Sequence, residues 1–220
     1  MTPQRILVRA PNWIGDQMLA YPFFHYLRAG YPGAHITAVS VPWVAALQFR
    51  HLVDAVHVLQ QPPLSSLWSR AQLLEASARW LRQQGPWDLG ICLPNSFSSA
   101  WLFMRAQVGR RRGYATDQRG WLLHEALSWQ KHATDHRTEA YLALLPTSVR
   151  PQQSLRDCWP ILASVDRAQT AGTGHPQFDA GRAWPGTTAL APPATPYWLL
   201  APGSMAESRR WPVDSFVTLA

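Results

Sequence analysis

Residues 6–20 read Ile-Leu-Val-Arg-Ala-Pro-Asn-Trp-Ile-Gly-Asp-Gln-Met-Leu-Ala, and this stretch decides the fold class. An apolar run of strand length breaks at a turn that ends in Gly15 and Asp16, and an amphipathic helical pattern follows. In open α/β sheets, ligands bind in the crevice outside the carboxyl ends of the strands. The stretch therefore predicts that Asp16 lies at a ligand-binding edge, like a catalytic group, and not among solvated surface charges.

The same alternation of strand and helix continues along the chain. Apolar runs typical of buried strands, separated by helical patterns, occur at Ile6–Val8, Ile36–Val41, Ala55–Leu59 and Leu89–Leu93. Parallel strands need long crossover connections, which are usually helices. The pattern therefore predicts the α/β class with a parallel sheet.

Three helical patterns fall between or after these strands. The first covers Asp16–Arg28 and contains Pro22, which removes a backbone hydrogen bond, so we expect a bend there and a cap at Gly30. A packing helix is expected within Ser65–Gln84 and an apolar helix over Ala100–Val108.

A second polar turn follows a strand end, at Pro94–Ser99. Amide and hydroxyl groups from both turns could therefore converge with Asp16 on a polyol such as a sugar; the groups in question belong to Asn12, Trp13, Asn95 and Ser96. A simpler interpretation stays open, in which Asp16 only caps its helix and Asn95 and Ser96 only shape a turn and cap the next one.

Two basic clusters could bind phosphate through planar, bidentate guanidinium groups. One is Arg110–Arg112, for which a solvated surface turn is the alternative. The other places Arg209 and Arg210 between the turn at Ser204 and a helix start, an arrangement suited to a diphosphate.

Metal and thiol chemistry find little support in the sequence. Cys92 and Cys158 lie far apart with no CxxC spacing, so both are expected to be ordinary thiols. The histidines near residue 136 lack a third ligand at credible spacing. Instead, the segment His136–Tyr141 is expected to begin a helix capped by Asp135 or Thr138. We therefore expect no metal and no cofactor.

Composition limits the partners without selecting one. The 220 residues carry a formal net charge of +7 and a pI near 10.1, which favours anionic partners such as sugar phosphates, nucleotides, acidic lipids or nucleic acid. No apolar run approaches the roughly 20 residues needed to span a bilayer, and no signal peptide pattern opens the chain. We therefore expect cytoplasmic residence. Neither GxGxxG nor a P-loop is present, which argues against dehydrogenases and P-loop enzymes.

The chain is expected to divide into three parts. Residues 1–148 form the first domain, and residues 149–196 form a linker in which Gly, Ala, Thr, Gln and Pro displace the periodic apolar pattern. Residues 197–220 resemble the strand, turn and first helix of a second domain. Such a unit cannot bury its own faces, so we expect either a continuation or docking on the first domain.

Five ordered segments resemble glycosyltransferase family 9, the lipopolysaccharide heptosyltransferases, and most closely the type that adds the second heptose of the inner core. They are Ala10–Asp16, Leu93–Phe97, Arg111–Tyr114, His136–Tyr141, and Pro202-Gly203 through Arg210-Trp211-Pro212. The resemblance implies a GT-B architecture of two Rossmann-like domains, the first holding the acceptor and the second, here truncated, holding the nucleotide sugar.

The resemblance also implies a mechanism. Asp16 would remove a proton from an acceptor hydroxyl that attacks the anomeric carbon of ADP-heptose, with inversion and without a metal. The implied acceptor-binding residues are Asn12, Trp13, Asn95, Ser96, Arg111 and Arg112. The implied donor-phosphate residues are Gly15, Ser204, Arg209 and Arg210, although Arg209 stands where the family usually has lysine.

The implied acceptor is the inner core of lipopolysaccharide, Kdo and heptose on lipid A, reached by peripheral contact with the inner face of the inner membrane. Nucleic acid is not an expected partner, because only the pI favours it. One alternative stays open: a non-catalytic remnant that binds anionic glycolipid or sugar phosphate without transfer.

Overall fold

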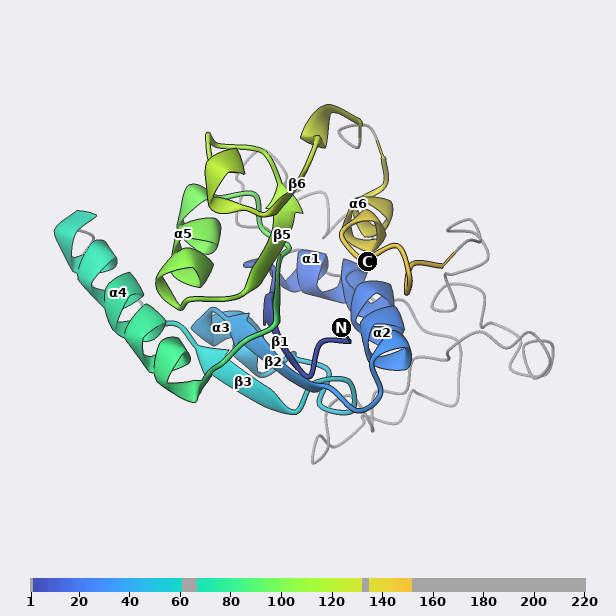
Figure 1. Ribbon diagram of the computed structural model, residues 1–220, viewed down its shortest axis with the longest axis horizontal. Helices are drawn as coiled ribbons and strands as arrows, with labels where there is room; N and C mark the ends of the chain where they lie inside the picture. Colours follow the sequence, from blue (N-terminus) through green and yellow to red (C-terminus); the bar gives the residue numbers. More distant parts are fainter. Residues whose placement is uncertain (1, 61–66, 132–134, 152–220) are drawn as a thin grey trace, which may run out of the picture. The chain divides into compact units, whose positions relative to one another are not determined.

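The computed structural model describes residues 2–60, 67–131 and 135–151, which form a six-stranded sheet with helices on both faces (Figure 1). The strand order is β3-β2-β1-β4-β5-β6, and every neighbouring pair is parallel. The strands are β1 (Arg5–Arg9), β2 (His35–Ser40), β3 (Ala55–Val58), β4 (Leu89–Cys92), β5 (Arg110–Tyr114) and β6 (Glu125–Leu127). The predicted α/β class and all four predicted strands are confirmed.

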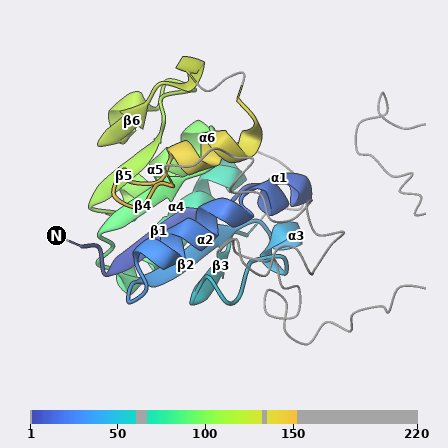
Figure 2. The ribbon, with the colours of Figure 1, turned by 90° about the vertical axis from the view of Figure 1, so that its right-hand side faces the viewer.

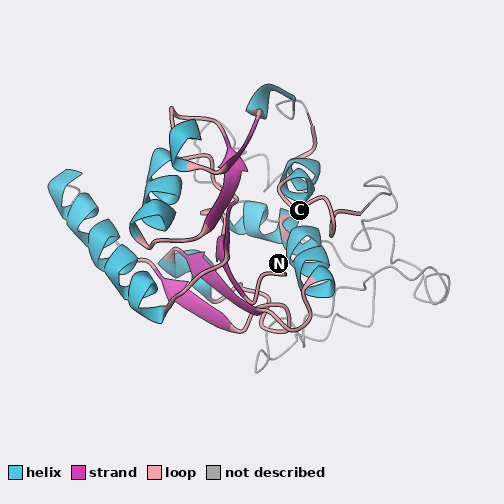
Figure 3. Ribbon diagram, viewed as in Figure 1, coloured by secondary structure: helices cyan, strands magenta, loops and turns pink. Residues whose placement is uncertain are grey.

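The helices form one layer on each face of the sheet, as the secondary-structure colouring shows (Figure 3). On one face α2 contacts α6, and on the other α4 contacts α5 (Figure 2). The helices are α1 (Ile14–Leu19), α2 (Tyr21–Gly30), α3 (Pro42–Ala45), α4 (Leu67–Gln84), α5 (Phe97–Arg105) and α6 (Arg137–Ala143), with 3-10 turns η1 (Gly120–Leu122) and η2 (Trp129–Lys131).

Alternation of side chains along β1 explains why both faces are covered. Ile6 and Val8 pack into the core cluster that contains Phe23 and Leu27 of α2, whereas Leu7 packs into the cluster that contains Phe103 of α5. A central strand that is apolar on both sides is stable only between two helical layers. The apolar run at the start of the chain therefore dictates the three-layer architecture.

The short first turn, bend and continuation expected around Pro22 take the form of two separate helices. The predicted helix divides at Ala20 into α1 and α2, and Pro22 lies in the first turn of α2, where its missing N–H would have no helical partner anyway. The proline therefore starts a new helix and does not bend an existing one. Gly30 is the last residue of α2, and the cap is Tyr31.

Two other helix boundaries differ from the predictions. Helix α5 begins at Phe97 and ends at Arg105, which is three residues earlier than predicted at each end. Helix α6 is capped by His136, whose Nδ1 accepts a hydrogen bond from the backbone N–H of Thr138 at 3.4 Å. The Thr138 hydroxyl instead donates to the carbonyl of Leu19 at 3.0 Å, so it fastens α6 to α1.

Several predictions fall on parts of the chain outside the described residues. These are the linker from residue 152 onward, the second-domain start at 197–220, the Cys158 thiol, and the donor-phosphate residues Ser204, Arg209 and Arg210. The division into domains therefore stays a prediction.

Gly90 in β4 is a position where any side chain would collide with the core. A Cβ built there would lie 2.7 Å from Cδ2 of Phe103 and 2.8 Å from Cγ1 of Val108. We expect Gly90→Ala to lower the free energy of unfolding by about 1–3 kcal/mol, the usual cost of overpacking a core. Urea unfolding measures this change.

Gly33→Ala is the matched control, because nothing lies within 4 Å of a Cβ at that position. Its unfolding midpoint should stay at the wild-type value or rise slightly, since alanine restricts the unfolded chain. Equal midpoints for the two variants would contradict the packing described for β4.

Candidate functional site

Two polar turns leave the sheet side by side. Strands β1 and β4 are parallel neighbours, with Arg9 in register with Cys92, and the N–H of Leu93 donates to the carbonyl of Arg9 at 3.1 Å. The turn after β1 and the turn after β4 therefore start at the same edge, the carboxyl edge of the sheet. This juxtaposition was predicted from the two strand ends.

Asp16 lies in the first turn of α1 with its side chain 32% exposed. Its Oδ1 is 4.0 Å from Nε of Arg137, whose guanidinium group lies over the Trp129 ring at 5.3 Å from the centroid. The N-cap of α1 is Trp13, and no side chain caps the helix by hydrogen bonding. Asp16 is therefore not a helix cap, and its carboxylate is accessible beside a cation.

A buried arginine holds the turn after β1. The Arg9 guanidinium donates to the carbonyls of Ala10 at 2.6 Å and Val39 at 3.2 Å, and to Oδ1 of Asn12 at 2.5 Å. The carbonyl of Asn12 also accepts from Nε1 of Trp43 at 2.7 Å. Burial lowers the pKa of Arg9 to about 10, so it stays a cation at neutral pH. Both ends of Asn12 are thus fixed.

A pocket of about 550 Å³ opens on the face of the sheet covered by α4 and α5. Its volume lies within the range of small-molecule sites. Among the described residues its lining includes two guanidinium groups and no carboxylate, and the polar residues are Arg9, Asn12, Trp43, Gln60, Arg70, Ser77, Ser98 and Ser99. Charge complementarity therefore favours an anionic, hydroxyl-rich ligand. Asp16 and Trp13 do not line the pocket.

The turn after β4 brings Asn95 and Ser96 to the same edge. Ser96 is the N-cap of α5, without a side-chain cap bond, and its Oγ lies 2.7 Å from Oγ of Ser99, which lines the pocket. The Oδ1 atom of Asn95 is buried with no hydrogen-bond partner among the described residues. Buried polar atoms in native structures almost always have a hydrogen-bond partner, so this acceptor is available to a water molecule or a ligand.

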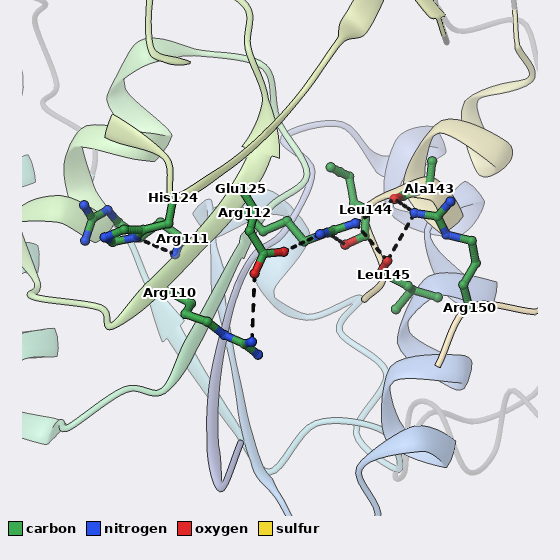
Figure 4. A network of polar contacts seen from close by, with 9 residues as sticks. All are labelled: Arg110, Arg111, Arg112, His124, Glu125, Ala143, Leu144, Leu145 and Arg150. Atoms are coloured by element: carbon green, nitrogen blue, oxygen red, sulfur yellow. Dashed lines mark hydrogen bonds and ion pairs between the residues drawn. The ribbon is translucent and has the colours of Figure 1, made fainter. Parts of the chain in front are cut away.

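Of the arginines predicted to bind phosphate, those of the cluster Arg110–Arg112 make intramolecular contacts (Figure 4). The Arg112 guanidinium, 11% exposed, pairs with Glu125 and donates to three carbonyls at the end of α6, those of Ala143, Leu144 and Leu145. Arginine at the carboxyl end of a helix satisfies backbone groups that lack helical partners. Arg112 thus joins β5 to α6.

The Arg111 side chain, like that of Arg112, hydrogen-bonds to backbone carbonyls of the protein itself. It donates to the carbonyls of Leu122 at 2.6 Å and Val108 at 2.8 Å. Arg110 and Arg111 are in register with Leu89 and Gly90, the first two residues of β4, so they lie toward the amino end of the strands and not at the carboxyl edge. The structure therefore does not bring this cluster together with Asp16.

Several groups at the site were missed from the sequence, among them Trp43, Arg70 and Arg137. Trp43 could have been found, because it follows the end of β2 just as Asn12 follows β1. Arg137 belongs to a segment noted for its family resemblance, but its pairing with Asp16 spans 121 positions and has no sequence signal.

The structure also bears on the predictions made for the cysteines and for metal ligands. Cys92 is a buried free thiol, as expected, and burial raises the pKa of this thiol to about 12. Within residues 2–60, 67–131 and 135–151, no three His, Cys, Asp or Glu side chains come together as metal ligands do. None of the helices in these ranges is both long and apolar enough to cross a bilayer.

Comparison with known proteins identifies the family. The model of glycosyltransferase family 9 (heptosyltransferase) matches residues 76–220, which is more than half of the chain. The chain belongs to this family. The match includes β4, the turn at Asn95 and helix α6, and it continues beyond the described residues.

Individual relatives agree with this assignment. Lipooligosaccharide heptosyltransferase 2 of Haemophilus ducreyi is 30% identical over 140 residues, covering 64% of this chain and 39% of the relative. The solved structure of the E. coli ADP-heptose lps heptosyltransferase II is 28% identical with a TM-score of 0.55, covering 71% of this chain and 46% of that one. The chain thus spans less than half the length of these relatives.

A family 9 glycosyltransferase from Veillonella parvula shares the fold at 21% identity. Its TM-score is 0.60, over 69% of this chain and 42% of that chain. The Rossmann-like parallel sheet predicted for the amino-terminal part is therefore confirmed.

Proposed function

We propose that this chain transfers L-glycero-D-manno-heptose from ADP-heptose to the inner core of lipopolysaccharide, with Asp16 as the general base. The observation that carries the proposal is the accessible Asp16 carboxylate at the carboxyl edge of the sheet, beside two turns rich in hydrogen-bonding groups. The relatives, a lipooligosaccharide heptosyltransferase 2 and an ADP-heptose lps heptosyltransferase II, support the donor and acceptor classes.

In the proposed reaction, Asp16 accepts the proton of an acceptor hydroxyl. The oxygen attacks the anomeric carbon of the heptose while the bond to ADP breaks and the electron pair leaves with ADP. Because the oxygen attacks opposite the leaving group, the configuration at the anomeric carbon is inverted. The proposed mechanism uses no metal ion. General base catalysis requires the carboxylate to be within hydrogen-bond reach of the hydroxyl. Arg137, 4.0 Å away, restrains the carboxylate from the side of α6.

The acceptor site is proposed to extend from Asp16 into the pocket. Asn12 and Trp13 would contribute from one turn, and Asn95 and Ser96 from the other. The guanidinium groups that line the pocket suit the acidic groups of the inner core. Arg111 and Arg112 would have to release backbone carbonyls to contact the acceptor, so the proposed site does not depend on them.

The donor site is proposed to use Gly15, Ser204, Arg209 and Arg210 around the diphosphate. Of these, only Gly15 belongs to the described residues, where it is exposed in the first turn of α1. Cytoplasmic residence with peripheral contact at the inner membrane is part of the same proposal, because an inner-core acceptor carries lipid A.

A second candidate function is binding without transfer. The observation that favours it is that the pocket with the two guanidinium groups is not lined by Asp16, so it can bind an anionic, hydroxyl-rich ligand without the proposed base. Calorimetry on the 220-residue chain separates the candidates. Binding of both ADP and core oligosaccharide supports transfer, oligosaccharide alone supports the binding module, and tight, salt-sensitive binding of single-stranded nucleic acid contradicts both.

Arg70 provides a variant for the same measurement. It lines the pocket from the exposed side of α4, so we expect Arg70→Met to weaken binding of an acidic core oligosaccharide about tenfold, as for a lost hydrogen bond to a charged group. Arg79→Met on the same helix is the control, because Arg79 is exposed and does not line the pocket. Equal affinities for the two variants would argue against the pocket as acceptor site.

A further inference from the structure

We propose that the loop 115–119, between β5 and η1, positions the turn 94–97 and thereby holds Asn95 ready for the acceptor. The positioning residues are Thr116, Asp117 and Arg119. This inference rests on the proposed function only in assigning the acceptor as the ligand of Asn95; the loop contacts themselves are independent of it.

Side chains of the loop 115–119 hydrogen-bond to the backbone at four consecutive positions of the turn 94–97. Nη1 of Arg119 donates to the carbonyls of Pro94 at 2.7 Å and Ser96 at 2.8 Å. The Thr116 hydroxyl donates to the carbonyl of Asn95 at 2.8 Å. The backbone N–H of Phe97, at the start of α5, donates to Oδ2 of Asp117 at 2.8 Å. Side chains of one loop therefore satisfy the backbone of the other.

Arg119 makes this contact from inside the protein. Its side chain is fully buried, and Nε donates to the carbonyl of Tyr114 at 2.8 Å. Space for the guanidinium depends on Gly113, where a Cβ would lie 3.3 Å from Nη2. A buried cation is retained only when hydrogen bonds compensate its desolvation. Two of its carbonyl partners flank Asn95.

The conformation of the loop is itself costly. Asp117 and Gln118 have φ values of 52° and 54°, in the left-handed region that L-residues rarely adopt. Residues in such conformations persist where the surrounding structure determines them, and they cluster at ligand-binding sites. Here the left-handed pair directs the Asp117 carboxylate to the start of α5, and Arg119 closes the turn through its N–H, which donates to the carbonyl of Thr116 at 3.0 Å.

The result is a fixed backbone that carries an unsatisfied side chain. Asn95 is held on both sides and at its own carbonyl, yet its Oδ1 atom is buried without a hydrogen-bond partner among the described residues. The Asn95 side chain as a whole is only partly buried, so its rotation alone would bring this acceptor atom to a sugar hydroxyl while the turn keeps its backbone conformation. Preorganisation of this kind increases affinity by reducing the entropy lost on binding.

Thr116→Val tests the inference, because it removes the hydroxyl and keeps the shape of the side chain. We expect the affinity for core oligosaccharide to fall about fivefold, the usual effect of one neutral hydrogen bond. Thr116→Ser should restore it, because serine retains the donor. Thr147→Val, at an exposed position in another turn, should leave the affinity unchanged.

A double-mutant cycle with Asn95→Ala shows whether the loop acts through Asn95. The expected result is strong coupling, with Thr116→Val having little further effect once the Asn95 amide is absent. Additive effects would overturn the inference while leaving Asn95 in the proposed site. No effect of Asn95→Ala alone would instead remove Asn95 from the proposed site.

Hydrogen exchange provides a readout that needs no glycan. The Phe97 amide should exchange faster in Asp117→Ala, because it loses its acceptor. The Ser99 amide, which donates to the carbonyl of Ser96 at 3.2 Å, should exchange faster in Thr116→Val, because the turn that holds its acceptor is loosened. Unchanged exchange in both variants would show that the turn holds its conformation without the loop, which overturns the inference whether or not oligosaccharide binds.

Discussion

Asp16→Asn is expected to reduce heptosyl transfer by about 10²–10⁴-fold, the usual contribution of a general base. Asparagine matches aspartate in size but cannot take the proton of the acceptor hydroxyl. Folding and acceptor affinity should stay close to wild type, because Asp16 caps no helix and is partly exposed. The measurement is ADP release with both substrates saturating, together with calorimetry on the acceptor.

Glu139→Gln is the matched control for this prediction. Glu139 is also an acidic residue in the first turn of a short helix, α6, but the proposed mechanism assigns it no role. Its turnover should equal that of the wild type. Wild-type turnover by Asp16→Asn would remove Asp16 from the mechanism, whereas a wild-type chain that binds oligosaccharide without turnover would favour the binding module.

Arg112→Met is expected to lower the free energy of unfolding by about 1–3 kcal/mol, the cost of leaving hydrogen-bond acceptors without their charged donor. The substitution keeps most of the apolar stem, but Glu125 loses its closest cation and the carbonyls at the end of α6 lose their donor. Arg150, which also donates to Ala143 and Leu145, compensates only in part. Urea unfolding provides the measurement.

The neighbouring Arg110 supplies the control. Its side chain is 50% exposed and lies 3.9 Å from Glu125, so Arg110→Met should cost at most about 1 kcal/mol, as for other surface pairs. If instead both variants unfold at the wild-type midpoint and lose acceptor affinity, the cluster binds ligand as the sequence first indicated, and the structural role of Arg112 is wrong.

The strands and the class of the fold could be predicted because β1, β2 and β4 are buried on both faces, which leaves continuous apolar runs in the sequence. Strand β5 was missed for the opposite reason. Its sequence, Arg-Arg-Arg-Gly-Tyr, has the composition of a surface turn, and only the backbone carbonyls and Glu125 around it make a strand of arginines stable.

The candidate site also has some features that the sequence predicts and others that it does not. Asp16 and Asn95 could be placed at one edge, because the rule for strand ends depends only on local order along the chain. The pocket, the pairing of Asp16 with Arg137 and the contact of Thr116 with Asn95 depend on which helix covers which strand. Such contacts join residues distant in sequence, and periodicity carries no information about them.

The contacts between α1 and α6 set a lower limit on the length of any fragment in which Asp16 keeps its position. The helix that carries Asp16 has only six residues, and two contacts from the beginning of α6 steady it: Arg137 beside Asp16, and the Thr138 hydroxyl on the Leu19 carbonyl. A polypeptide cut after β6, at Leu127, would retain all the described strands of this sheet and still remove the two α6 contacts that support α1 and Asp16. Expression boundaries for this protein should therefore be drawn beyond α6.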